Sequence, residues 1–145
     1  MNDAFRRMKL DFRSSIPIYL QIVDRVERMI TEGELKTGDQ LPTVRELATE
    51  LRVNFNTVAR AYRILDDARI ISTQRGRGTY IWEEPDENAL QDLRRMSLEE
   101  VTRHAVEKMT SLGFSHVEIL EAVQRQVEQK DKRTELPFTD NELNE

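Results

Sequence analysis

The chain has 145 residues, 38% of them hydrophobic, which suffices for one small domain with an appendage. It has no cysteine, which excludes disulfides and thiolate metal sites and suits the reducing cytoplasm. The net charge of −5 is unevenly divided: residues 1–82 hold 14 basic and 11 acidic side chains, and residues 83–145 hold 8 and 16. The front part can therefore approach phosphate groups, while the acidic rear should face away from them. The sequence contains no apolar stretch typical of a signal peptide or a membrane span, so we expect a cytoplasmic location.

Three helices are predicted in the first half of the chain. Pro17 stands at a favourable first-turn position, and apolar residues follow it at intervals of three and four. The second helix starts after Thr43, which forms a capping-box pattern with Glu46. A tight turn ends this helix, and Asn54 is a favourable N-cap for the third. Tyr62 lies on the apolar face of the third helix, so we expect it in the core.

A β-hairpin is predicted after the third helix, with strands at about residues 71–74 and 79–82. Arg75 and Arg77 flank Gly76 in its turn, where they can reach a minor groove or phosphates. Three helices, the last two joined by a tight turn and followed by a hairpin, are the element order of a winged helix-turn-helix. We therefore predict a mainly α fold with a small β-hairpin. Its expected parts are a DNA-binding domain at 16–84, a helix-turn-helix at about 44–63 and a wing at 71–82.

The start of the third helix carries side chains that can read DNA. A major groove about 12 Å wide accepts one helix, whose N-terminal end meets the base edges. Asn54 and Asn56 can pair with adenine, and Phe55 or Thr57 can contact a thymine methyl. Arg60 follows one turn later. The pattern leaves two positions open for Phe55, which either meets DNA or is buried against the first helix.

The rest of the chain predicts a small helical segment. Ser97 with Glu100, and Ser115 with Glu118, form capping-box patterns at the starts of two amphipathic helices. Gly113 should end the first of these helices in a left-handed conformation, which makes a helical hairpin. So short a segment buries little by itself, so we expect a second copy of the chain to cover its apolar stripes. The predicted dimerisation tail spans 85–130, with contacts from Leu98, Val101, Ala105, Met109, Leu112, Val117, Leu120, Val123 and Val127, and 131–145 should be disordered.

Four segments resemble, in the correct order, the motifs of the GntR family of bacterial regulators. Residues 41–48, LPTVRELA, are similar to its LPSxRELA signature, and residues 56–62, NTVARAY, to its recognition helix NTVxRAY. Residues 75–80, RGRGTY, resemble its wing RGRGTFV, and residues 17–22, PIYLQI, its first-helix motif PlYxQI. The resemblance spans residues 16–82 and implies a winged helix-turn-helix that binds double-stranded DNA. Carried over by position, it implies DNA contacts from Thr43, Arg45, Asn54, Phe55, Asn56, Thr57, Arg60, Arg75, Gly76 and Arg77.

The sequence departs from the family pattern at four positions. Phe55 stands where many members have Arg, and Ala59 where the fatty-acid-responsive branch has Arg, so the base preference of that branch cannot be copied. Arg52 and Arg69 each replace a frequent Gly at a helix end. A left-handed backbone there costs a non-glycine residue about 1 kcal/mol, so we expect slightly changed turns.

The C-terminal part points to a subfamily. Residues 83–145 are too few for the effector-binding or aminotransferase-like domains of the large GntR branches. A short helical tail, with LGFSHVEILEAV at residues 112–123, resembles the YtrA subfamily. That resemblance implies a dimeric repressor, often of a transporter operon. Two recognition helices that enter successive major grooves predict a near-palindromic operator. It names no small-molecule effector.

Two other classes of function compete with DNA binding. A winged helix can serve as a protein-interaction module without specific DNA binding, although the basic wing and the polar start of the third helix argue against it. An enzyme lacks support, because the sequence shows no nucleophile–base–acid set and no phosphate-binding loop. His104 and His116 could join Glu residues at a metal, but a satisfied or solvent-facing pair is the preferred interpretation, and no cofactor is expected.

Overall fold

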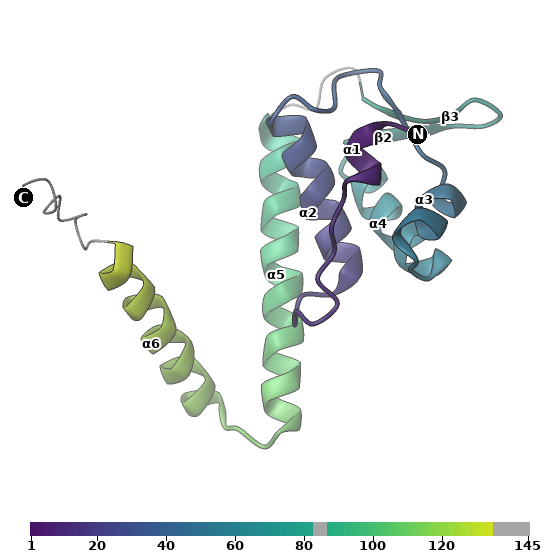
Figure 1. Ribbon diagram of the computed structural model, residues 1–145. Coiled ribbons are helices and arrows are strands. Elements are labelled where there is room, and N and C mark those ends of the chain that lie inside the picture. Colours follow the sequence, from purple (N-terminus) through teal and green to yellow (C-terminus); the bar gives the residue numbers. More distant parts are fainter. Residues whose placement is uncertain (83–86, 135–145) are drawn as a thin grey trace, which may run out of the picture. The chain divides into compact units, whose positions relative to one another are not determined.

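The computed structural model describes residues 1–82 and 87–134, which form a mainly helical fold with a small antiparallel sheet (Figure 1). This confirms the predicted fold class. The chain divides into two compact units, Met1–Thr102 and a second one from Arg103 onward. Its elements are α1 (Asp3–Arg6), α2 (Ile18–Thr31), β1 (Gln40–Leu41), α3 (Val44–Leu51), α4 (Phe55–Asp67), β2 (Ile71–Gln74), β3 (Gly78–Ile81), α5 (Glu87–Ser111) and α6 (His116–Thr134).

Helices α2, α3 and α4 pack around one apolar core, as their periodicity predicts. Ile22 and Val26 of α2, Leu47 of α3, and Val58 and Leu65 of α4 are completely buried there. Tyr62 is also in this core, and its hydroxyl donates a hydrogen bond of 2.6 Å to the carbonyl of Pro42. Burial raises the pKa of the Tyr62 phenol, which therefore stays protonated and keeps this bond to the segment before α3.

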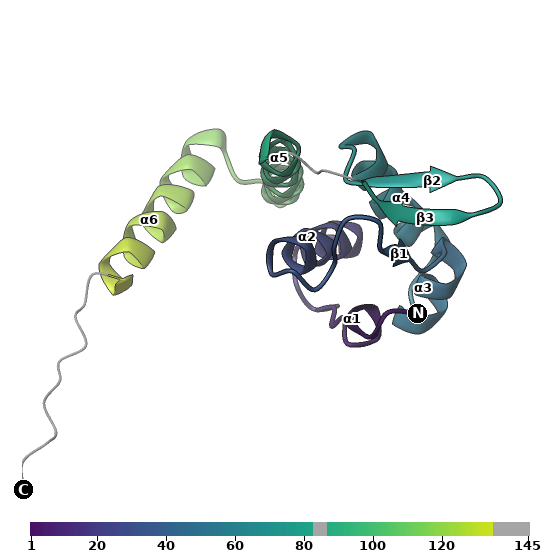
Figure 2. The same cartoon turned by 90° about the horizontal axis from the view of Figure 1, so that it is seen from above.

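The wing is a three-stranded sheet with the order β1–β3–β2. The hairpin β2–β3 was expected, and its strands begin and end within one residue of the predicted bounds. Strand β1 was not predicted: Gln40 pairs with Tyr80 and Leu41 with Thr79. The segment before α3 is thereby joined to the hairpin, which projects beyond the helices in both views of the fold (Figures 1 and 2).

The first compact unit is larger than the predicted domain at both ends. The predicted domain begins at residue 16, but Phe5 of α1 is completely buried in the core and Met8 is buried as well. At the other end, Leu93 of α5 is completely buried in the same core. The unit therefore extends to Thr102, whereas the sequence placed the boundary at residue 84.

Helix α5 begins ten residues earlier than expected. The Ser97–Glu100 pattern predicted a helix start, but α5 starts at Glu87 and both residues lie inside it. The other predicted start is confirmed: the Ser115 N–H donates to Glu118 Oε2 at 2.7 Å, and the Glu118 N–H donates to Ser115 Oγ at 3.2 Å. A capping-box pattern thus marks a helix start only where the preceding residues break the helix, as Gly113 does with its φ of +89°.

The two helix ends with arginine in place of glycine keep the left-handed conformation. Arg52 has a φ of +54° and Arg69 a φ of +58°, so the expectation of changed turns was wrong. Each turn keeps a hydrogen bond that closes the helix, from the Val53 N–H to the Ala48 carbonyl at 3.0 Å and from the Ile70 N–H to the Leu65 carbonyl at 2.9 Å. These bonds, with Ile70 completely buried, offset the left-handed cost of about 1 kcal/mol at each arginine.

Helix α6 forms the main part of the second unit. It continues to Thr134, four residues into the segment that was expected to be disordered from residue 131; the rest of that segment lies outside the described residues. On α6, Ile119 is 5% exposed, although the predicted apolar stripe omitted it, and its neighbour Leu120 is 70% exposed.

No helix in the described ranges is both long enough and apolar enough to traverse a lipid bilayer.

Candidate nucleic-acid interface

Helix α3 begins at the expected capping box. The Glu46 N–H donates to Thr43 Oγ1 at 3.1 Å, and the Thr43 N–H donates to Glu46 Oε2 at 2.8 Å. The hydrogen bond from the Thr43 backbone, followed by the contact with its side chain, lowers the pKa of the Glu46 carboxyl below 4.5. This carboxylate is bound to the cap, and Arg45 beside it is exposed on the first turn of α3. A cation at this position can meet a phosphate or a base edge.

Asn54 is the N-cap of helix α4, as predicted. Asn54 Oδ1 accepts a hydrogen bond of 2.8 Å from the Asn56 N–H, which satisfies one free amide of the first turn. A bidentate pair with adenine uses both the oxygen and the nitrogen of an amide, and the cap already engages the Asn54 oxygen. Asn56 is exposed on the same turn. Of the two asparagines, it is the one suited to reading adenine.

The aromatic ring at the start of α4 is exposed. Phe55 is 50% exposed, so the alternative in which it is buried against the first helix is not the one the structure shows. Thr57, two residues later, is half-buried. An exposed ring at a helix end that carries partial positive charge is able to make an apolar contact with a thymine methyl.

The tip of the wing is held by side chains that the sequence pattern did not single out. The Tyr80 hydroxyl donates to the Arg77 carbonyl at 2.7 Å, and Gln40 Nε2 donates to the same carbonyl at 3.4 Å. Gly78 has a φ of +121°, and a Cβ at this position would lie 2.5 Å from Gln40 Nε2. The backbone of the turn is therefore fixed. Arg75 and Arg77 are exposed on it, and neither has an ion-pair partner among the described residues.

Arg60 differs from the expectation that it faces the groove. Its guanidinium carbon lies 4.0 Å from the centroid of the Tyr19 ring, and its Nη2 lies 3.3 Å from Glu100 Oε1. The structure thus directs Arg60 toward α2 and α5 and away from the exposed set at the start of α4. Ile64, four residues later on the same helix face, packs against the core.

The two histidines do not form a metal site in the described part of the chain, where no group of three or more potential ligand side chains comes together. His104 Nε2 lies 3.3 Å from Arg103 Nη2, and His116 is exposed at the start of α6.

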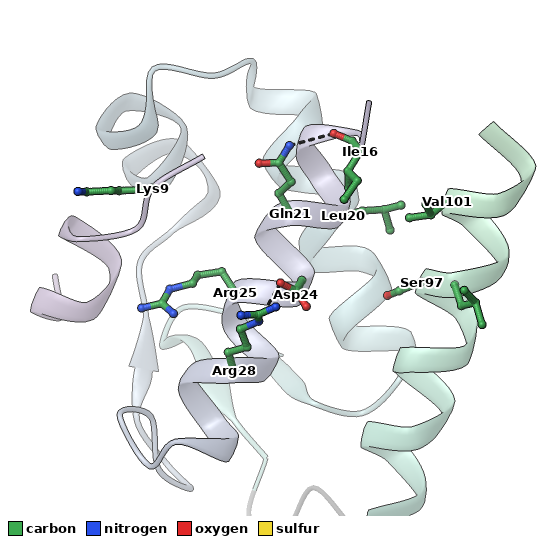
Figure 3. A pocket seen from close by; sticks show the side chains of 10 residues that line it. Lys9, Ile16, Leu20, Gln21, Asp24, Arg25, Arg28, Ser97 and Val101 are labelled. Carbon is green, nitrogen blue, oxygen red and sulfur yellow. Dashed lines mark hydrogen bonds and ion pairs between the residues drawn. The ribbon is translucent and has the colours of Figure 1, made fainter. Parts of the chain in front are cut away.

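A hollow of about 490 Å³ lies beside α2 and the middle of α5 (Figure 3). Two of its cations are already paired: Arg28 lies 3.1 Å from Asp24, and Arg25 lies 3.7 Å from Glu34. Its lining combines apolar and charged side chains: Lys9, Ile16, Leu20, Gln21, Asp24, Arg25, Arg28, Ser97, Leu98 and Val101. Leu98 and Val101 are also expected dimer contacts, so the hollow borders the predicted dimerisation face.

The packed helices α2, α3 and α4, the exposed start of α4 and the arginine-tipped hairpin define a winged helix-turn-helix DNA-binding domain. The family model for bacterial regulatory proteins of the gntR family matches residues 18–81. The HTH-type transcriptional regulator YhcF of Bacillus subtilis is 39% identical over 116 residues, which cover 80% of this chain and 94% of that protein. The chain belongs to the GntR family, whose members are transcriptional regulators and not enzymes.

The resemblance to YtrA is confirmed by two further relatives. The HTH-type transcriptional repressor YtrA of Bacillus subtilis is 51% identical over 76 residues, which cover 52% of this chain and 58% of that protein. The solved structure of YtrA from Sulfolobus acidocaldarius, a GntR-family transcription factor, is 34% identical with a TM-score of 0.52, and the match covers 84% of this chain and 97% of that one.

Proposed function

We propose that this protein is a homodimeric repressor that binds a near-palindromic operator. The observation that carries the proposal is the exposed start of α4, with Phe55 and Asn56, beside a wing whose Arg75 and Arg77 are exposed. Two such reading ends, related by a two-fold axis, enter successive major grooves about 34 Å apart. Occupation of a promoter in this way blocks transcription, which agrees with the name of the related repressor YtrA.

The proposed contacts divide by what each side chain can reach. Asn56, Phe55 and Thr57 read base edges from the start of α4. Arg45 on α3 clamps a phosphate or a base, and Thr43 donates its hydroxyl beside it. Around Gly76, Arg75 and Arg77 enter a minor groove or meet phosphates. Asn54 contributes by capping α4, and the adenine contact expected of it is assigned to Asn56.

A second copy of the chain is the proposed cover of the apolar residues on α5 and α6. Large side chains left exposed in series on a single chain mark an interaction surface. On these two helices and in the connection between them, the large side chains that are at least 38% exposed are Met96, Leu98, Val106, Leu112, Phe114, Val117, Leu120, Val123 and Val127. Ala105 is also exposed, and Met109 and Val101 are half-buried. Six of these nine large residues are among those predicted for dimerisation, and Met96, Val106 and Phe114 are additions.

A gel shift with the DNA upstream of the protein's own gene tests the proposal. We expect a shifted complex containing two chains, which weakens steeply as salt rises because phosphate contacts release counterions. Sedimentation of the free protein should give a dimer. If no salt-sensitive shift is found with this DNA or with a random duplex library, the protein is instead a winged-helix interaction module.

The regulated genes and any effector belong to the same proposal. The YtrA resemblance favours a transporter operon, and an inverted repeat before such an operon beside this gene would support it. An effector must bind more tightly to the dimer geometry that misplaces the two reading ends. The hollow of Figure 3 offers space for a small molecule next to Leu98 and Val101, where binding would change that geometry.

A further inference from the structure

Tyr19, Arg60 and Glu100 form a cluster that joins three helices. Tyr19 comes from α2, Arg60 from the recognition helix α4, and Glu100 from α5. Glu100 Oε1 accepts a hydrogen bond of 2.6 Å from the Tyr19 hydroxyl and lies 3.3 Å from Arg60 Nη2. The Arg60 guanidinium also stacks on the Tyr19 ring at 4.0 Å. Each residue therefore contacts the other two.

The cluster is better suited to fixing an orientation than an ordinary surface ion pair. A planar guanidinium that stacks on a ring and meets a carboxylate is held in one geometry, which a flexible ammonium is not. The Glu100 side chain is 26% exposed and that of Arg60 51%, so water and salt screen this pair less than a fully exposed one.

The cluster adds a polar attachment to the apolar packing of α5 on the first compact unit. Leu93 of α5 is completely buried in the core, and the partly buried Ala89, Leu90 and Val101 pack against it. Glu100 is seven residues beyond Leu93, about 10 Å along the helix axis. Apolar side chains can slide on one another, whereas a stacked guanidinium that also meets a carboxylate has a defined geometry, so the cluster restricts the direction of α5 more sharply than this packing alone. Leu98 and Val101, on either side of Glu100, are proposed dimer contacts, so the fixed direction reaches the dimerisation face.

We propose that Arg60 is a positioning residue: with Tyr19 and Glu100 it fixes the angle between α4 and α5 and so sets the distance between the two reading ends of the dimer. This inference rests on the proposed homodimer. It assigns to Arg60 a role different from the DNA contact implied by its place on the recognition helix. It also predicts that Glu100, which the family motifs do not include, matters for DNA recognition.

The test measures how strictly the protein requires one spacing between half-sites. The wild-type dimer first selects its operator from a random duplex library. Operators with the half-sites one base pair closer or further apart are then compared with it. We expect the variant Glu100→Gln to bind the selected operator on the order of tenfold more weakly and to lose most of its preference among the spacings. The dependence of its affinity on salt should stay unchanged, because no phosphate contact is removed.

Matched variants separate positioning from other effects. Glu99→Gln removes the same charge from the exposed neighbouring position on α5 and should behave as the wild type. Tyr19→Phe keeps the ring and removes only the hydroxyl that donates to Glu100, so it should shift the spacing preference in the same direction by a smaller amount. Circular dichroism of each variant establishes that it is folded. If Glu100→Gln does not fold, Tyr19→Phe decides the question alone.

The competing role of Arg60 gives a different set of results. If Arg60 contacts a phosphate, Arg60→Met lowers the salt slope by about 0.9 and weakens every spacing equally, while Glu100→Gln binds as the wild type. That outcome overturns the inference, and so does an unchanged spacing preference in both Glu100→Gln and Tyr19→Phe. A wild-type protein that binds DNA as a monomer, or not at all, instead overturns the proposed function itself.

Discussion

The carbonyl oxygen of the Asn54 side chain accepts a hydrogen bond of 2.8 Å from the backbone N–H of Asn56. Two asparagines that look equivalent in the sequence therefore have different chemical roles. Asn54 stabilises the first turn of α4, and Asn56, exposed on that turn, keeps both amide groups available for a base.

We predict that the two asparagines affect different measurements. Asn56→Ala should lose about 1–3 kcal/mol of discrimination at one adenine position of the operator with little change in stability. Asn54→Ala should lose about 0.5–2 kcal/mol of unfolding free energy, and Asn54→Asp, which can cap in the same way, should keep it. Competition binding with point-substituted operators and urea unfolding measure the two effects. A loss of base discrimination in a stable Asn54→Asp variant would contradict this division.

The wing gives a prediction about salt. Replacing both Arg75 and Arg77 by Ala should reduce the slope of log affinity against log salt by about 0.9 for each phosphate that the wing no longer neutralises. All operator sequences should weaken to a similar degree if these arginines meet the DNA backbone. Arg95→Ala on α5, whose side chain pairs with Asp92, is the matched control and should leave the slope unchanged. An unchanged slope in the wing variant would remove the wing from the interface.

Features set by neighbouring residues could be predicted from the sequence. The caps at Thr43 and Asn54 need only side chains two or three positions away, and the hairpin turn needs only its glycines. The exposed face at the start of α4 followed from the same local pattern. In each of these features, the interacting residues lie within a few positions of one another in the sequence.

Features set by distant contacts could not be predicted in this way. Phe5 is separated from the core helices by charged residues, so it shows no period that would mark it as buried. Glu100 formed a capping pattern with Ser97, but its actual partners are Tyr19 and Arg60, distant in sequence. The contacts of Arg60 with Tyr19 and Glu100 were missed for the same reason, since its helix alone does not show what packs beside it.

The capping box at α3 predicts a pH dependence of stability. The pKa of Glu46 is lowered in the folded state by hydrogen bonds from Thr43, so its carboxylate contributes stability above the unfolded value of about 4.5. That contribution is lost as the pH falls below 4.5 through the folded pKa. The Glu46→Gln side chain still accepts a bond from the Thr43 N–H but does not titrate. As the pH is lowered below 4.5, the unfolding free energy of this variant should therefore decrease less steeply than that of the wild type. Urea unfolding at pH 3 to 6 measures it, with Glu50→Gln on the same helix as the control.

The exposed stripe on α6 predicts the assembly state. A Leu120→Glu substitution places a charge at a side chain that is 70% exposed in the single chain, so it should leave the fold of one chain intact while disfavouring any apolar interface there. We expect a monomer by sedimentation at micromolar concentration and an affinity for the full operator reduced to that for a half-site. Gln126→Glu adds the same charge at an exposed polar position of α6 and should remain dimeric. If Leu120→Glu sediments as a dimer and binds the full operator like the wild type, α6 is not the interface, and the residues of α5 must form it without α6.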